Sequence, residues 1–279
     1  MLFSPATTRR FRQAVAGAAC VGLAMVSQLA IAQPAADAPS FPAAGRLIRG
    51  AGAEELMRAL YAVRDPRRPV YANATVCGPK PCKLRLLAVD AWEGEDGRER
   101  LLLVAAAEPV EAAHAARALI GIAALRRAPG GWALEAGSPA VDALGEWGQA
   151  PAIATVLAGA FGRGVVATPQ YTAQGVELTS WGLYLLLEGR FVKVMQLETG
   201  QDSTAACEAH DAVCRRRADV QDFSSVVDTA PAQDGGLDVT QAITPATPAG
   251  PAAEILAWHI DPTGRVRQIL GRQDNRRDR

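Results

Sequence analysis

Short runs of aliphatic, β-branched and aromatic residues, separated by turn-forming residues, make up most of the chain after residue 70. The clearest case is Val176–Thr199, where two such runs meet at Glu188, Gly189 and Arg190. These residue types favour strands, and a short connection that contains glycine permits a tight reversal. The pattern therefore predicts a β-hairpin at the centre of the fold.

The same pattern predicts further strands along the chain. The polar turn Glu93–Gly97 separates two apolar runs, and an Asp-Pro-Thr-Gly turn at 261–264 separates two more. Strand-like runs occupy residues 69–77, 83–108, 119–137, 153–175, 223–230, 237–243 and 254–270. We expect these runs to pair as neighbouring hairpins.

Helical and irregular segments are fewer. Leu56, Leu60 and Val63 recur at helical spacing and predict a helix over residues 52–64. The alanine-rich residues before Ala118 suit a second helix. We expect irregular structure at the glycine-rich residues 137–151, and a long surface loop with one strand at 229–253.

These elements predict a mainly antiparallel β fold with about ten short strands and one or two short helices. A β-rich α+β fold is the alternative, and a parallel α/β fold is disfavoured. We expect a single domain over residues 46–271, preceded by a flexible leader at 33–45 and followed by a frayed basic tail at 272–279.

Residues 1–32 have the pattern of an export signal. Arg9, Arg10 and Arg12 precede an apolar run, and Ala30-Ile31-Ala32 resembles a cleavage site. Cleavage before Gln33 leaves 26 basic against 29 acidic residues, a net charge of about minus three. A membrane anchor is the alternative, but the run spans only about 18 residues and lacks a stop-transfer flank. We expect a periplasmic or secreted protein without a membrane span after cleavage.

Four cysteines remain after the signal: Cys77, Cys82, Cys207 and Cys214. An even number in an exported chain indicates disulfides, and pairing within each local pair needs the least long-range geometry. Cys207, His210 and Cys214 could alternatively bind zinc. Their spacing matches no known zinc module, and an oxidising compartment favours the disulfide.

Catalytic signatures are weak in this sequence. It contains no G-x-S-x-G motif and three histidines. His210 lies between two cysteines and, with Glu198 and Asp202, forms the one polar cluster that could serve a hydrolase. We expect His114 on the surface and His259 in a strand. Catalysis is therefore the less favoured role.

Other site chemistries find little support. The acidic groups at 93–99 and 198–211 could bind calcium, but the first lacks the D-x-D-x-D-G ladder. No glycine-rich stretch forms a P-loop, so no nucleotide cofactor is expected. The basic run 215–217 belongs to a net acidic chain and does not indicate a nucleic-acid partner. Trp92, Trp147, Trp181 and Tyr184 could form a sugar platform, although core packing is expected.

The sequence thus predicts an exported, disulfide-stapled β protein with a binding or structural role in the bacterial cell envelope. Its expected partner is an envelope protein or glycan, and no cofactor is expected. A hydrolase that acts on an envelope polymer and a calcium-stabilised module are the two alternatives.

Overall fold

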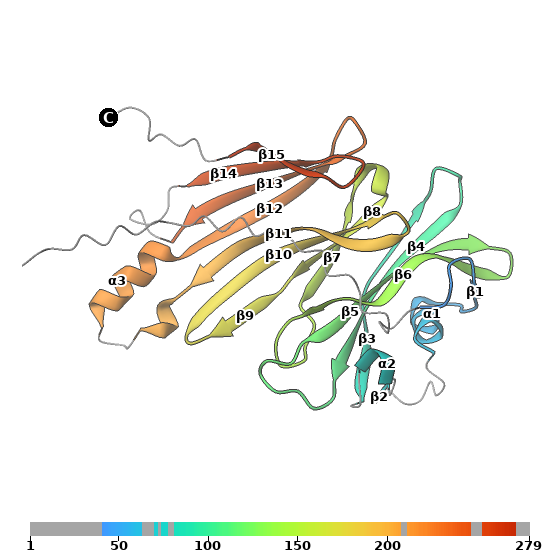
Figure 1. The fold of residues 1–279 in the computed structure, drawn as a ribbon, viewed down its shortest axis with the longest axis horizontal. Coiled ribbons are helices and arrows are strands. Elements are labelled where there is room, and N and C mark those ends of the chain that lie inside the picture. The colour runs from blue at the N-terminus through green and yellow to red at the C-terminus, as the bar shows by residue number, and fades with distance from the viewer. Residues whose placement is uncertain are drawn as a thin grey trace, which may run out of the picture. The chain divides into compact units, whose positions relative to one another are not determined.

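The computed structural model describes residues 41–62, 70–71, 74–77, 81–207, 211–246 and 253–271. These residues form two antiparallel sheets, so the predicted fold class is confirmed (Figure 1). Sheet A has the strand order β1 (Leu47–Ile48), β6 (Gly131–Leu144), β5 (Ala118–Ala128), β4 (Glu99–Pro109), β3 (Cys82–Glu93) and β2 (Val70–Tyr71).

Sheet B has the order β15 (Val266–Leu270), β14 (Glu254–Ile260), β13 (Leu237–Pro245), β12 (Phe223–Pro231), β11 (Arg190–Asp202), β10 (Val176–Leu187), β8 (Arg163–Thr168) and β7 (Ala152–Leu157). β9 (Gln170–Ala173) also pairs with β10. The helices of the described residues are α1 (Ala53–Leu60), α2 (Ala74–Cys77) and α3 (Ala212–Gln221), with 3-10 turns η1 (Gly159–Phe161) and η2 (Thr204–Ala206).

The central hairpin forms as predicted. β10 and β11 pair from Glu177 opposite Asp202 to Leu187 opposite Arg190. The loop consists of two residues rather than three, Glu188 and Gly189, with φ values of 49° and 76°. Two consecutive positive φ angles define the type I′ turn, whose twist matches that of the flanking strands.

The described residues contain fifteen strands, more than expected, and one segment predicted to be irregular lies partly in a sheet. β6 continues through residues 137–144 and pairs with β5 as far as Leu144 opposite Ala118. At 229–253, β12 ends at Pro231 and β13 spans Leu237–Pro245, so the described part of this segment contains the one strand that was predicted within the loop. In β6, pairing with β5 overrides the local glycine and proline content.

The helical content differs from the prediction at three places. Residues 74–77, expected to be extended, form α2. The alanine-rich residues 110–117 form bends and turns instead of a helix. α3 was not predicted, because its sequence has three consecutive arginines and no apolar stripe.

Several strands are buried on both faces, because successive side chains point to opposite sides of a sheet. Leu101 and Leu103 of β4 pack with α1, whereas Leu102 and Val104 belong to the core between the two sheets. This burial on both faces explains the uninterrupted apolar run of β4, since neither face needs polar residues.

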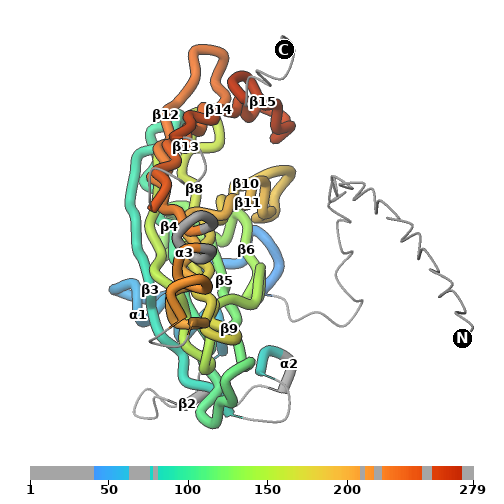
Figure 2. Tube along the Cα trace, turned by 90° about the vertical axis from the view of Figure 1, so that its left-hand side faces the viewer, coloured from blue at the N-terminus to red at the C-terminus, as the bar shows by residue number. Residues whose placement is uncertain are grey.

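Sheet B shows the same two-sided burial. On β10, Tyr184 faces sheet A, and Leu183 and Leu185 face a third core within sheet B. In that third core, residues of β10 and β11 pack against Leu237 and Ile260 of β13 and β14. Sheet B therefore folds back on itself, and the path from β10 to β13 can be followed in Figure 2.

Polar contacts join the two sheets where their cores meet. The Tyr184 hydroxyl on β10 donates a hydrogen bond of 2.6 Å to Asp142 Oδ2 on β6, and Lys193 Nζ on β11 donates one of 2.8 Å to the same oxygen. Arg163 of β8 forms a 2.9 Å ion pair with Asp90 of β3. These contacts fix how sheet B lies against sheet A.

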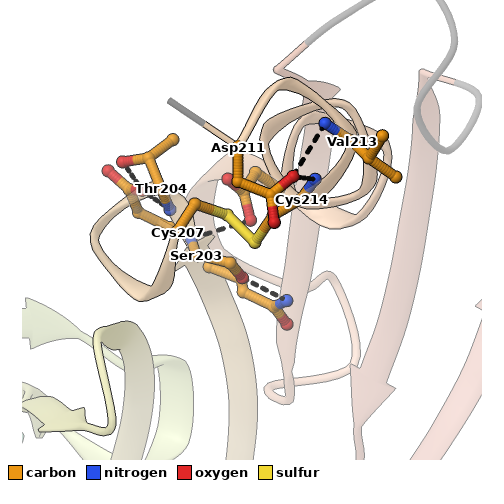
Figure 3. Close-up of a disulfide and its surroundings, with 9 residues drawn as sticks. Ser203, Thr204, Cys207, Asp211, Val213 and Cys214 are labelled. Atoms are coloured by element: carbon orange, nitrogen blue, oxygen red, sulfur yellow. Dashed lines mark hydrogen bonds between the residues drawn. A yellow bond between two sulfur atoms is a disulfide. The ribbon is translucent and has the colours of Figure 1, made fainter. Parts of the chain in front are cut away.

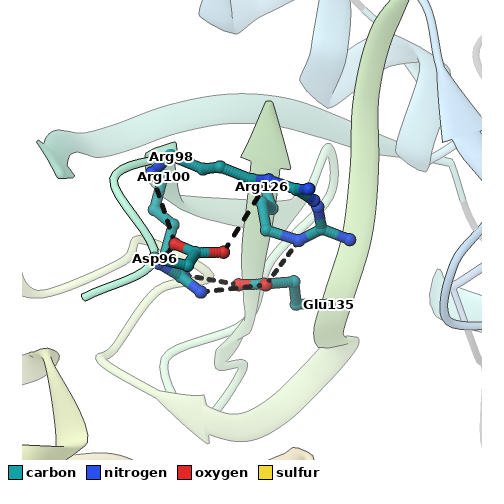
Figure 4. Close-up of polar contacts among 5 residues, drawn as sticks. All are labelled: Asp96, Arg98, Arg100, Arg126 and Glu135. Carbon is teal, nitrogen blue, oxygen red and sulfur yellow. Dashed lines mark hydrogen bonds and ion pairs between the residues drawn. The ribbon is translucent and has the colours of Figure 1, made fainter. Parts of the chain in front are cut away.

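Another ionic cluster spans three neighbouring strands of sheet A (Figure 4). Glu135 accepts hydrogen bonds from Arg100 Nε at 3.1 Å and from Arg126 Nε at 3.0 Å. Arg100 also donates to Asp96 at 2.7 Å, which lowers the pKa of that carboxyl group. Asp96, a member of the candidate calcium group, therefore balances the charge of Arg100.

Both predicted disulfides are present. Cys77 at the end of α2 is bonded to Cys82 at the start of β3, with Cα atoms 6.1 Å apart. Cys207 after η2 is bonded to Cys214 in α3, with Cα atoms 5.6 Å apart (Figure 3). Asp211 Oδ1 accepts hydrogen bonds from the backbone N–H groups of Val213 and Cys214, so it caps α3.

Candidate functional site

Five strands of sheet B, β7, β8, β10, β11 and β12, enclose a groove of about 640 Å³. β7 contacts β12 although β8, β10 and β11 lie between them in hydrogen-bond order. The backbone N–H of Ala160 in η1 donates to the carbonyl of Gly235, next to β12, at 2.8 Å. The sheet therefore curls so that β7 meets β12, and the groove lies on the inner face of this curl.

On β7, β8 and β10 the lining residues occupy every second position, whereas on β11 the four consecutive residues 199–202 line the groove. On β12 they include Phe223, Ser225, Val227 and Thr229, which occupy every second position. Apolar side chains on the inner face are Val156, Val166, Trp181, Phe223 and Val227. Hydroxyl groups come from Thr168, Thr179, Thr199, Ser224, Ser225 and Thr229. Apart from two carboxylates, the lining thus combines an apolar surface with uncharged hydrogen-bonding groups, a composition typical of small-molecule sites.

A seam of buried polar residues closes one side of the groove. β11 and β12 pair at only two positions, Gly200 opposite Ser224 and Gln201 opposite Phe223. Among the described residues, the buried polar ones are Ser203, Asp222 and Gln241, and all three lie at this junction. Asp222 accepts a hydrogen bond of 2.9 Å from the backbone N–H of Ser203. Side chains therefore hold together two strands that the backbone ladder leaves largely unpaired.

Two carboxylates lie at the exposed mouth of the groove. Glu177 of β10 and Asp202 of β11 are direct cross-strand partners, and both line the groove. Asp202 Oδ1 accepts hydrogen bonds of 2.6 Å and 2.9 Å from the hydroxyl and backbone N–H of Thr204. These bonds lower the pKa of Asp202, so its side chain is an anion at neutral pH and a weak proton acceptor.

The three residues proposed from sequence for hydrolysis lie in different places. Asp202 lines the groove, but Glu198 does not. Strict alternation would place residues four apart on one face, yet Thr199 is an extra residue in the pairing of β10 with β11. This bulge turns Glu198 to the face opposite Asp202. His210 lies outside the described residues.

His259 lies in β14, as expected, but the sequence did not indicate the two carboxylates beside it. His259 Nδ1 lies 2.7 Å from Asp238 Oδ1, and Nε2 lies 3.0 Å from Asp234 Oδ2. The hydrogen bond with Asp238 and the charge of Asp234 raise the pKa of His259. Both ring nitrogens are engaged by carboxylates, so neither is free to accept a proton from a substrate. Only the pairing of β13 with β14 brings these residues together.

The remaining aromatic and histidine candidates have different surroundings. The ring of His114 meets that of Trp147 edge to face, with centroids 4.8 Å apart, and its side chain is 44% exposed as predicted. Trp147 is exposed, whereas Trp181 and Tyr184 are buried. Trp92 packs against the core between the sheets. The four aromatic residues therefore do not form one platform.

Within the described ranges, no three side chains of histidine, cysteine, aspartate or glutamate are grouped so that they could hold a metal ion. The helices in this part of the chain are all too short or too polar to cross a membrane.

A scan against protein-family models finds no matching family, and searches of curated proteins and of solved structures return no match.

Proposed function

We propose that this chain is an exported binding protein that holds a small ligand with an apolar body in the groove of sheet B, without catalysing a reaction on it. The groove itself carries this proposal. Its volume of about 640 Å³ falls in the range of small-molecule sites, which is roughly 300–1,000 Å³. A protein or glycan of the envelope as a further partner stays a prediction from sequence.

The packing around the groove supports a permanent cavity. The strands that form it are fixed on their other face by the core shared with sheet A, through residues such as Val165, Ala167 and Tyr184. One side of the groove continues into the third core, whereas Phe223, Val156 and Val227 are only partly buried. Apolar surface is therefore available on a rigid frame, and a ligand would gain affinity by covering it.

The chemistry of the lining argues for binding over catalysis. Asp202 is engaged with Thr204, and Glu198 faces the opposite side of the sheet. In the described part of the chain, no histidine or cysteine lines the groove. Hydroxyl groups without a neighbouring base can orient a ligand, but they are not activated as nucleophiles.

A fluorescence titration tests this function. N-phenyl-1-naphthylamine, a neutral apolar probe, should bind the parent protein saturably. Ala154 lines the groove at an exposed position of β7, so Ala154→Trp should fill the groove and abolish binding. Ala230→Trp is the matched control, because Ala230 is exposed on β12 and points away from the groove. Absence of saturable binding to the parent, or equal binding to both variants, would overturn the proposal.

Export rests on the pattern of residues 1–32 and agrees with the two disulfides, which persist in oxidising compartments. Intact-mass analysis of protein recovered from the periplasm or medium of a bacterial host should give a chain that starts at Gln33. A cytoplasmic protein that retains residues 1–32 would contradict export. It would not affect ligand binding, which the fluorescence titration tests separately.

A further inference from the structure

The two carboxylates at the mouth of the groove form an unusual pair. Glu177 and Asp202 lie directly opposite each other on antiparallel strands, so their side chains share one face at close range. Like charges in this arrangement destabilise a sheet. Both side chains are exposed at the same end of a groove whose inner surface is apolar.

The local contacts leave this negative charge uncompensated. Glu177 Oε1 accepts a hydrogen bond of 3.2 Å from the amide of Gln170, and Asp202 is bonded to Thr204. These donors are neutral. Among the described residues neither carboxylate takes part in an ion pair. By contrast, the carboxylates that join the sheets are paired with Lys193 and Arg163.

The groove also contains no compensating charge. Across the described residues its lining includes no lysine, arginine or histidine. One end of the groove is therefore anionic, and the rest of its lining is apolar or carries hydroxyl groups. Electrostatic complementarity favours a cation at the mouth and disfavours an anion.

We propose that the ligand is a cationic amphiphile, with an ammonium head at Glu177 and Asp202 and an apolar chain inside the groove. This inference rests on the proposed binding function and adds the chemical class of the ligand. The chain supplies most of the affinity, since each buried methylene contributes about fourfold. The exposed carboxylates act mainly on selectivity, because exposed ion pairs are weak, and together they should favour an ammonium over a carboxylate head by about tenfold.

A head-group series tests this assignment. Decyltrimethylammonium, decanoate and 1-decanol, each below its aggregation concentration, compete with N-phenyl-1-naphthylamine for the groove. The ammonium compound should compete about tenfold more strongly than decanoate, with the alcohol between them. This preference should shrink as salt is raised, because the head contacts exposed charges.

Charge-neutral variants complete the test. Glu177→Gln with Asp202→Asn should remove the head-group preference while the probe still binds, since both amides keep acceptor oxygens for Gln170 and Thr204. Asp228→Asn is the matched control, because Asp228 is exposed on the outer face of β12 beside Val227. Should the double variant fail to fold, the salt dependence of the parent protein decides.

The outcomes separate this inference from the proposed function. If the probe binds but the three decyl compounds compete equally, or if the preference survives in the double variant, the ammonium assignment is wrong and the binding groove stands. If the probe does not bind the parent at all, the proposed function fails and the ligand assignment fails with it.

Discussion

The side-chain amide of Gln241 on β13 donates a hydrogen bond of 2.6 Å to the backbone carbonyl oxygen of Glu198 on β11. The same nitrogen lies 2.9 Å from Ser225 Oγ, which in turn donates to the carbonyl of Thr199 at 3.2 Å. These side-chain hydrogen bonds lie beyond the point where the backbone pairing of β11 with β12 ends. A single buried amide thereby links the two parts of sheet B that enclose the groove.

Gln241→Leu should lower the free energy of unfolding by about 1–3 kcal/mol, because it leaves the Glu198 carbonyl without its donor while keeping a side chain of similar size. Urea unfolding followed by circular dichroism measures the change. Gln268→Leu serves as control, since Gln268 is exposed on β15 and should change stability by no more than about 0.5 kcal/mol. Equal stability of the two variants would contradict a linking role for Gln241.

Tyr184→Phe should destabilise the protein by about 1–2 kcal/mol, because it removes a hydrogen bond to the charged Asp142 at the contact between the sheets. Tyr171→Phe, at an exposed position, should have almost no effect. Burial and the neighbouring Asp142 charge raise the pKa of Tyr184. In an alkaline absorbance titration, the Tyr184 signal should therefore appear only above the ordinary tyrosine range, and a signal within that range would argue against burial.

The His259 site predicts a specific pH dependence. Asp238 and Asp234 raise the pKa of His259 in the folded chain above its ordinary value of 6.5. A raised folded pKa means that the folded state holds the proton more tightly, so the stabilisation is complete below about pH 6.5 and is lost as pH rises through the folded pKa. Arg267 on β15 is the cross-strand partner of His259 and is the charged residue that this pairing places opposite it.

Comparison of the parent protein with His259→Gln checks this sign. The difference in Tm between them should be largest at about pH 6 and should fall towards about pH 9. An NMR titration of the His259 ring should give a midpoint above 6.5. A Tm difference that grows with pH, or a midpoint below that value, would mean that the carboxylates do not hold a charged imidazole.

The Cys207–Cys214 disulfide should stabilise the fold, since it closes a loop and ties η2 to α3. Replacing both cysteines by serine should lower the free energy of unfolding by about 2 kcal/mol. His210→Ala, within the same loop, should change it by no more than about 0.5 kcal/mol and should leave ligand binding intact. Thermal unfolding of both variants measures this contrast. A His210 variant that loses an activity present in the parent would instead support a hydrolase.

Local sequence was enough to predict most of the strands, the main reversals and the local pairing of the cysteines. The Glu188-Gly189 turn and the turn at 261–264 carry residues that favour their own conformations, so β10–β11 and β14–β15 could be predicted from a few neighbouring positions. The paired cysteines are five and seven residues apart, which makes local pairing the simplest connection. Each of these features depends on contacts that lie close in the chain.

The groove and its mouth depend on tertiary structure. They require β7 to meet β12, a contact between segments about seventy residues apart that no local pattern specifies. The sequence also did not show on which face of the sheet each side chain lies. The bulge at Thr199 puts Glu198 and Asp202 on opposite faces, and the register places Asp202 beside Glu177. Strand registers and sheet curvature are set by packing against distant strands, so a single sequence predicts most of the strands but not which side chains meet.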